Sequence, residues 1–199
     1  MKYDVILAGV GGQGVLSVAS IIAHAAMSEG LEVRQGEVHG MAQRGGAVLA
    51  HLRISDKKIA GDLVPRGGAD LIISMEPLES LRYVSYLKKD GIILTAAEPF
   101  KNISNYPDIE GVYSLIKKLP KHQIIQAASL AKEAGLSKAV NTVMVGAASR
   151  FLPVDEKSIE KIITESFAKK EASIVEANTK AFKLGLHACR HTPAKKEKK

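Results

Sequence analysis

Residues 10–15, VGGQGV, restrict the fold of this chain more than any other stretch, because they place glycines between a strand pattern and a helix pattern. Residues 3–10 are apolar and β-branched, as expected for a parallel strand buried on both faces. Residues 15–30 have helical apolar spacing and end at a glycine, and residues 31–38 have the composition of a second strand. A corner this rich in glycine indicates that another group approaches the backbone closely.

Strand and helix patterns continue to alternate through residue 135. After the glycine corner, we expect strands at 46–54, 69–75, 92–97 and 122–127, and helices at 76–91, around 109–119 and at 128–135. The strand at 46–54 is a candidate for antiparallel pairing, and Ile59 is a candidate start of a short return strand. From Asn141 onward the pattern is helical, with Asp155 as an expected N-cap. The sequence therefore predicts an α/β fold: a doubly wound, mostly parallel sheet with helices on both faces and C-terminal helices packed on it.

The glycine corner matches G-x-G-x-x-G, with Gly9, Gly11 and Gly14 at the three glycine positions. The first glycine permits the tight turn, the second lets a phosphate approach the backbone, and the third lets helix and strand pack closely. Gly12 exposes further backbone, and Gln13 adds an amide. Four hypotheses remain open: a phosphate or CoA-like ligand, a conventional dinucleotide, a partner chain, or glycines that only pack the helix onto the sheet. The dinucleotide hypothesis lacks an acidic residue at the end of the second strand.

A second glycine loop lies in residues 37–48, EVHGMAQRGGAV. Arg44 beside Gly45 and Gly46 has the composition of an anion site, a guanidinium next to an exposed backbone. In a doubly wound sheet this loop opens at the same edge as the first, so both should face one crevice. The alternative is a surface loop with a solvated arginine. His39 has no partner at catalytic spacing and is expected to be a structural or interface residue.

Composition excludes several classes of protein. The single cysteine, Cys189, cannot form an internal disulfide, an iron–sulfur cluster or a thiolate zinc site, and no metal-ligand spacing is present. No apolar run is long enough to span a membrane, and no leader pattern is present, so we expect a cytoplasmic protein. Of the net charge of +7, the basic segment 189–199 carries more than half, so we expect no nucleic-acid partner. We predict one domain over 1–188 and a disordered tail over 189–199.

The two glycine stretches together, GVGGQGVLSVASIIAHAA and EVHGMAQRGGAVLAHLRIS, resemble the gamma-type subunits of the 2-oxoacid:ferredoxin oxidoreductases. The HGMAQRGG version is most similar to the beta subunit of the indolepyruvate enzymes. Three later stretches agree with the resemblance, which covers about residues 3–188: ADLIISMEPLESLRY, AVNTVMVGA and NTKAFKLG.

This resemblance implies a subunit that is inactive alone and has no catalytic residue of its own. A large alpha subunit would carry thiamine diphosphate and the iron–sulfur clusters, decarboxylate an aryl pyruvate, reduce ferredoxin and transfer the acyl group to CoA. The pyruvate and 2-oxoglutarate enzymes have similar gamma subunits, so they remain alternatives. A stand-alone NAD(P)-binding protein and a structural scaffold are alternatives of another class. CoA is the one ligand expected near this chain, and the expected contacts are Gly9, Gly11, Gly12, Gln13, Gly14, Arg44, Gly45 and Gly46.

Overall fold

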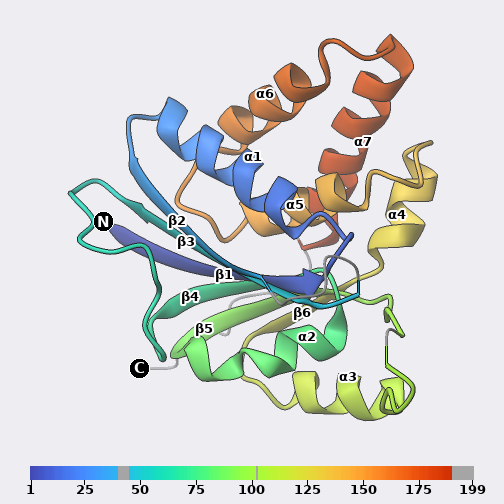
Figure 1. Ribbon diagram of the computed structural model, residues 1–199. Helices are drawn as coiled ribbons and strands as arrows, with labels where there is room; N and C mark the ends of the chain where they lie inside the picture. The colour runs from blue at the N-terminus through green and yellow to red at the C-terminus, as the bar shows by residue number, and fades with distance from the viewer. Residues whose placement is uncertain (40–44, 102, 190–199) are drawn as a thin grey trace, which may run out of the picture.

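The structure, a computed structural model, describes residues 1–39, 45–101 and 103–189. These residues form one six-stranded sheet with the order β2-β3-β1-β4-β5-β6 (Figure 1). β1, β4, β5 and β6 run parallel, whereas β3 pairs antiparallel with both β1 and β2. The strands are β1 (Lys2–Val10), β2 (Glu32–His39), β3 (Ala47–Ser55), β4 (Ala69–Ser74), β5 (Leu87–Ala96) and β6 (His122–Ile125).

The predicted α/β fold and the antiparallel pairing of the strand near 46–54 are confirmed. One difference is that β3 lies between β1 and β2, so the first two strands of the chain are not neighbours. The ladder between β1 and β3 is continuous from Lys2↔Ser55 to Val10↔Ala47. β3 is suited to this interior position because both of its faces carry buried apolar side chains, Leu52 and Ile54 on one and Leu49 on the other.

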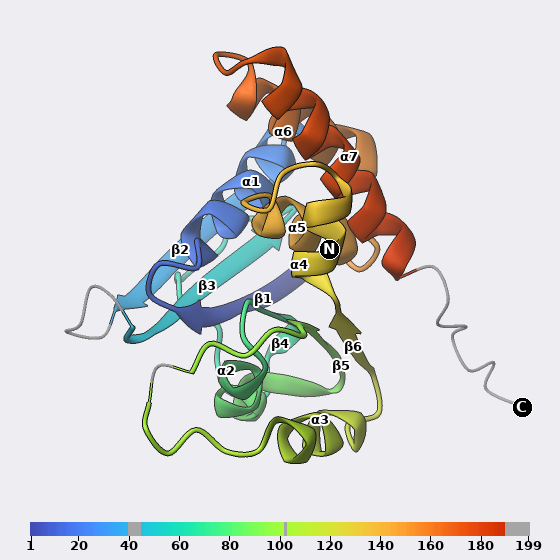
Figure 2. The same ribbon diagram turned by 90° about the vertical axis from the view of Figure 1, so that its right-hand side faces the viewer.

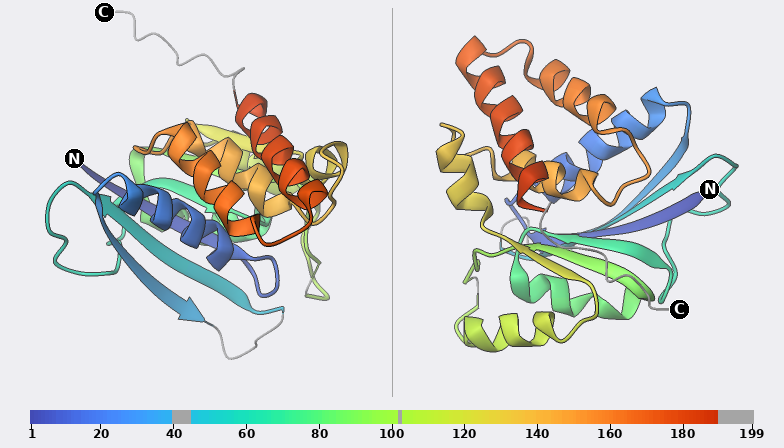
Figure 3. Two further views of the ribbon diagram at one scale, coloured as in Figure 1. Left: turned by 90° about the horizontal axis from the view of Figure 1, so that it is seen from above. Right: turned by 180° about the vertical axis from the view of Figure 1, so that it is seen from behind.

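Helices cover both faces of the sheet, as Figures 1 and 2 show. One face carries α1 (Val15–Ser28), α4 (Ala127–Glu133), α5 (Val140–Ser149), α6 (Glu156–Phe167) and α7 (Ala172–Ala188). The other carries α2 (Pro77–Arg82) and α3 (Ile109–Lys117), with a 3₁₀ turn at Val84–Tyr86. The views from above and behind in Figure 3 show the β2–β3 end of the sheet reaching beyond these two helices.

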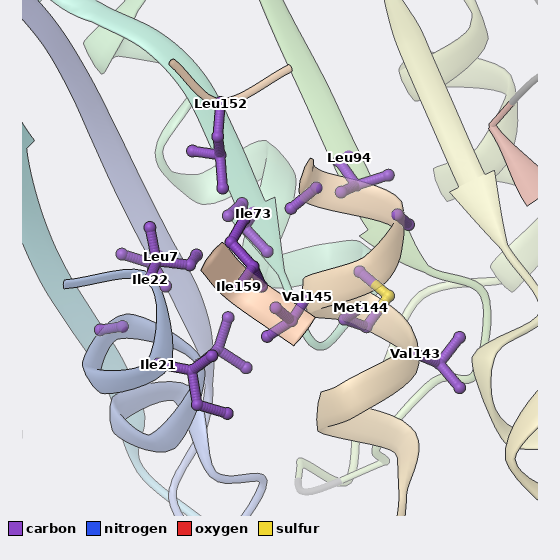
Figure 4. Close-up of a cluster of buried hydrophobic side chains, with 14 of the residues drawn as sticks. Leu7, Ile21, Ile22, Ile73, Leu94, Val143, Met144, Val145, Leu152 and Ile159 are labelled. Atoms are coloured by element: carbon purple, nitrogen blue, oxygen red, sulfur yellow. The ribbon is translucent and has the colours of Figure 1, made fainter. Parts of the chain in front are cut away.

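The larger hydrophobic core lies between the sheet and α1, α5 and α6 (Figure 4). Leu7 of β1 and Ile73 of β4 meet Ile22 of α1, Val145 of α5 and Ile159 of α6 there. A smaller core on the opposite face includes Ile6, Ile72 and Ile93, each of which directly precedes a strand residue of the larger core. Successive strand residues therefore supply opposite cores, as their continuous apolar runs predicted.

α5 and α7 approach one another closely because each has a glycine at the contact. A Cβ on Gly146 would lie 2.1 Å from the carbonyl oxygen of Phe182, and a Cβ on Gly185 would lie 2.0 Å from that of Val143. The hydroxyl of Thr142 also donates to Asn178 Oδ1 at 2.7 Å. α5 is buried from Thr142 to Ser149, so it forms the centre of the helical layer.

The predicted helix over 76–91 is wrong after its second turn. α2 ends at Arg82, and β5 begins at Leu87. Gly91 lies within a register irregularity between β4 and β5, and a Cβ on it would lie 2.7 Å from Leu87 and 2.9 Å from the carbonyl oxygen of Ala69. This glycine therefore permits close strand packing and does not end a helix.

Residues 56–68 pack against the face of β3 that carries His51 and Arg53, and they do not form the short return strand expected at Ile59. Arg53 of β3 donates to the carbonyl oxygens of Gly61 and Leu63 at 2.8 and 3.1 Å, and to both oxygens of the buried Asp4. His51 Nδ1 accepts from the Val64 N–H at 3.1 Å. Burial, and then the charge of Arg53, lower the pKa of His51, which keeps the ring neutral and able to accept this bond.

The C-terminal region is helical as predicted, and the Asp155 side chain caps α6 by accepting from the Lys157 N–H. Among the described residues, no helix is both long enough and apolar enough to cross a membrane. The predicted tail is described only at Cys189, so its disorder stays a prediction.

Candidate functional site

A pocket of about 430 Å³ opens where β1, β4 and β5 reach their carboxyl ends. Gly12, Gln13 and Gly14 form one side, and Met75 follows β4. The opposite side comes from Ala96 at the end of β5, from residues 98–100 after it, and from the first turns of α4 and α5. The carboxyl edge of parallel strands is the place where open α/β sheets bind their ligands.

The first glycine corner needs its glycines for two different reasons. A Cβ on Gly9 would lie 2.7 Å from Val15 Cγ2 and 3.0 Å from Gln13 Oε1, so Gly9 allows β1 and α1 to pack together. Gly12 and Gly14 have φ angles of +100° and +76°, which other residues adopt only with strain. A Cβ on Gly14 would also overlap the Asn141 side chain of α5, whereas one on Gly12 would have no described atom within 4 Å. Gly12 is therefore the corner residue whose backbone is open to a ligand.

Gln13 fixes the corner to the sheet. Its Oε1 accepts from the Val10 N–H at 2.8 Å, and its Nε2 donates to the Met75 carbonyl oxygen at 3.2 Å. The side chain thus satisfies a buried backbone donor at the end of β1 and joins the ends of β1 and β4. The Gln13 amide therefore holds the corner against the sheet and also forms part of the pocket wall.

The second glycine loop lies against the first, as expected for the residues that can be seen. The Gly11 N–H donates to the Gly46 carbonyl oxygen at 2.8 Å, and the Gly45 N–H donates to that of Gly11 at 3.4 Å. Gly45 has a φ of +78°. Arg44 lies outside the described residues, as does the His39 side chain. Gly9, Gly11, Gly45 and Gly46 stand beside the pocket and are not part of its lining.

Sequence reasoning missed the pocket residues contributed by the second half of the chain. Glu98 and Phe100 follow β5, Lys138 precedes α5, and Asn141 lies in its first turn. Asn141 Nδ2 also donates to the Gly14 carbonyl oxygen at 3.4 Å. The strand expected at 92–97 was the available clue, because residues that directly follow a parallel strand share the ligand-binding edge with the corner after β1.

A buried carboxylate, Glu76, supports the loop that carries Phe100. Its Oε2 accepts from the Glu79 N–H at 2.8 Å and so caps α2, while its Oε1 accepts from the Phe100 N–H at 3.3 Å and from the Tyr106 hydroxyl. Burial, followed by this bond to Glu76, raises the pKa of Tyr106 well above its usual value, so the hydroxyl stays protonated and keeps donating. Tyr113 donates to the Ala97 carbonyl oxygen from α3.

Glu98 is held by one of its two carboxylate oxygens. Oε1 accepts from the Ala128 N–H at 2.8 Å, in the first turn of α4. Oε2 is shielded from solvent and has no hydrogen-bond partner among the described residues. Lys138, the cation of the pocket, forms no ion pair in the described part of the chain and is exposed.

The pocket has the chemistry of a binding site. The Gly14 N-cap of α1 and the Ala139 N-cap of α5 make no side-chain capping bond, and Lys138 adds a positive charge, which together favour an anionic group. Met75, Phe100 and Val140 provide apolar surface. Residues 1–39, 45–101 and 103–189 contain no group of three His, Cys, Asp or Glu side chains placed to hold a metal.

The fold and the two joined glycine loops define a known class of protein. Residues 4–188 match the model of the pyruvate ferredoxin/flavodoxin oxidoreductase family, and the chain belongs to that family. Within it, the chain is 37% identical to the indolepyruvate oxidoreductase subunit IorB of Thermococcus kodakarensis, over 95% of this chain and 96% of that one. It is 38% identical to IorB of Pyrococcus horikoshii, with the same coverage.

Solved structures have the same fold. The pyruvate oxidoreductase subunit PORC of Thermotoga maritima superposes with a TM-score of 0.72 at 25% identity, over 94% of this chain and 96% of that one. The 2-oxoglutarate:ferredoxin oxidoreductase of Magnetococcus marinus, which holds 2-oxoglutarate, coenzyme A and succinyl-CoA, superposes with a TM-score of 0.77 at 21% identity. This chain covers 96% of its own length there but spans only 31% of that larger chain.

Proposed function

We propose that this chain is the small, gamma-type subunit of an indolepyruvate:ferredoxin oxidoreductase, which converts aryl pyruvates to acyl-CoA and reduces ferredoxin. The observation that carries the proposal is the near-full-length similarity to IorB subunits, at 37–38% identity. Gamma subunits shared by pyruvate and ketoisovalerate oxidoreductases are 30% identical over 87% of the chain, which supports the aryl-pyruvate enzyme over those alternatives.

The reactive centre would belong to a large partner subunit carrying thiamine diphosphate and the iron–sulfur clusters. One cysteine cannot supply the four thiolates that a cluster commonly needs. Of the described residues at the pocket, none pairs a nucleophile with a general base within hydrogen-bond reach. The chain would thus complete the complex without performing the chemistry. We also keep the proposal of one domain over 1–188 followed by a separate basic tail.

For the pocket we propose contact with CoA. Gly12, Gln13 and Gly14 would present backbone and amide groups, with Lys138 and the predicted anion site at Arg44 facing the phosphates. Gly9, Gly11, Gly45 and Gly46 would hold the two loops in place. The carboxylate of Glu98 works against a phosphate placed directly beside it, so the phosphates would lie toward Lys138 and the glycine corner.

A conventional dinucleotide site is less well supported by this sheet. Such a site uses an acidic residue at the end of the strand next to β1, where it meets the ribose. Here the strand next to β1 on that side is β3, which runs antiparallel, and β2 lies one strand further away. Glu37 at the end of β2 is therefore displaced from the glycine corner by a full strand.

Co-expression with a large alpha subunit of an indolepyruvate oxidoreductase tests the function. We expect a brown complex that reduces ferredoxin with indolepyruvate and CoA, and less efficiently with pyruvate or 2-oxoglutarate. The purified chain alone should be inactive with all three. Turnover by the isolated chain with only a nicotinamide and a substrate would contradict the proposal, as would a complex that reduces ferredoxin without using CoA.

The CoA contact is tested in the same complex with Arg44→Ala and Lys138→Gln. Because Lys138 is exposed and screened by solvent, we expect its loss to raise the KM for CoA about two- to fivefold, with the KM for indolepyruvate unchanged. Arg44→Ala should raise the KM for CoA as well, while gel filtration shows an intact complex. If Arg44→Ala instead separates the subunits, the second glycine loop docks the partner and does not contact CoA, and the same result for Lys138→Gln would place the turn before α5 in the interface.

A further inference from the structure

The least explained group in the pocket is the carboxylate of Glu98. Its Oε1 is engaged by the Ala128 N–H, whereas its Oε2 is shielded from solvent and meets no donor among the described residues. Withdrawing a carboxylate oxygen from water without replacing its hydrogen bonds is costly, and folded proteins seldom keep such a group without a use. Glu98 nevertheless lines the pocket, so a ligand can approach it.

Among the described residues, no donor compensates this oxygen. In the described segments the cation of the same pocket, Lys138, pairs with no carboxylate. The terminal torsion of a glutamate has a broad minimum, so a small rotation of the carboxylate can turn Oε2 toward the pocket that Glu98 lines. In the described part of the pocket, Glu98 Oε2 is thus an acceptor that a donor on a bound ligand can satisfy.

We propose that Glu98 Oε2 accepts a hydrogen bond from an amide N–H of the pantetheine arm of CoA. This inference rests on the proposed function and assigns it a specificity-determining residue. A negative oxygen rejects phosphate and favours a neutral donor, so this side of the pocket suits the arm and not the nucleotide. Phe100 and Val140 supply the apolar wall that the methylene groups of such an arm require.

The inference also explains why the two charges of the pocket stay apart. Lys138 remains free of Glu98 within the described structure, so each charge keeps its own preference, Lys138 for anions and Glu98 for N–H donors. A ligand with phosphates at one end and amides along its length satisfies both groups at once. A free carboxylate, which carries no hydrogen-bond donor, would leave Glu98 Oε2 without a partner.

Glu98→Gln tests the inference with almost no change in shape. The glutamine oxygen can still accept from Ala128, but the atom at the Oε2 position becomes an N–H donor. In the assembled complex we expect the KM for CoA to rise about 10- to 100-fold, because a charge-assisted bond is lost and two donors then face each other. The inhibition constant of 3′,5′-ADP, which has two of the three phosphates of CoA and lacks the arm, should not change.

The isolated chain supplies a second readout that does not depend on catalysis. Because a neutral amide is cheaper to bury than an unpartnered carboxylate, Glu98→Gln should raise its Tm by about 2–4 °C. Glu133→Gln is the matched control, since Glu133 lies exposed at the other end of α4, and it should change neither Tm nor KM.

The outcomes separate this inference from the function on which it rests. A KM for CoA that does not change, a fall in Tm, or an equal rise in the constant for 3′,5′-ADP would overturn the role of Glu98 while leaving the subunit assignment intact. Loss of assembly in Glu98→Gln would also overturn it, because the missing donor would then come from the partner chain. If the wild-type complex uses no CoA, the proposed function itself fails.

Discussion

Replacing Arg53 by methionine is expected to lower the free energy of unfolding by about 3–5 kcal/mol. Arg53 is 9% exposed and Asp4 is 1% exposed, and the guanidinium donates to both carboxylate oxygens at 2.9 and 3.3 Å. Methionine keeps the apolar stem but leaves a buried carboxylate without its main partner. The substitution also removes the bonds to Gly61 and Leu63 that hold residues 56–68 on the sheet. Urea unfolding followed by circular dichroism measures the change.

The control for Arg53→Met is Lys2→Met, because Lys2 contacts the same carboxylate at 3.1 Å from an exposed position. That pair should contribute less than about 1 kcal/mol. The double variant Asp4→Leu/Arg53→Met should recover much of the lost stability, since no isolated charge then remains buried. If Arg53→Met is no less stable than Lys2→Met, the buried Arg53–Asp4 pair does not stabilise the fold as described.

Gly146→Ala is expected to destabilise the protein by about 2–3 kcal/mol. Alanine is the better helix former by about 1 kcal/mol, but its Cβ would stand 2.1 Å from the Phe182 carbonyl oxygen, a backbone atom that cannot rotate away. α5 and α7 would have to separate, which would open the buried contact around Thr142 and Asn178. Thermal unfolding measures the effect.

Gly111→Ala in α3 is the matched comparison for Gly146→Ala. Its nearest neighbour beyond the adjacent residues, Asp108 Oδ2, would be 3.9 Å from the new Cβ. The same substitution should therefore raise stability there by about 0.5–1 kcal/mol. Opposite signs for the two variants would separate helix propensity from helix packing, and equal signs would contradict the close approach of α5 and α7.

The strand, corner and helix at the N-terminus could be predicted because several local patterns agreed there. Residues 3–10 are continuously apolar, the glycines follow at once, and the spacing in 15–28 is helical. The meeting of the two glycine loops also followed from the sequence, because it requires only that β1 and β2 point the same way. That direction is set by the fold class and holds whether or not another strand lies between them.

The errors arose where tertiary contacts decide between local alternatives. Residues 87–90 have helix-compatible side chains, but they belong to β5, which pairs with β4 at Leu87 and again from Ile92. Glu76 was expected at the start of a helix and Glu98 just beyond a strand, and only the folded chain brings the backbone donors of Phe100 and Ala128 to them. No pattern in a single sequence encodes such contacts between segments separated by tens of residues.

α5 connects two distant parts of the chain, because its first turn forms a wall of the pocket while its body is held against α7. α7 is the last helix of the described residues, so it emerges after α1–α6 during synthesis. The pocket wall reaches its final position only when the carboxyl-terminal helix has docked. A nascent chain can thus complete its sheet before α7 has been synthesised, whereas the part of the ligand surface on α5 is packed in place only after α7 has docked.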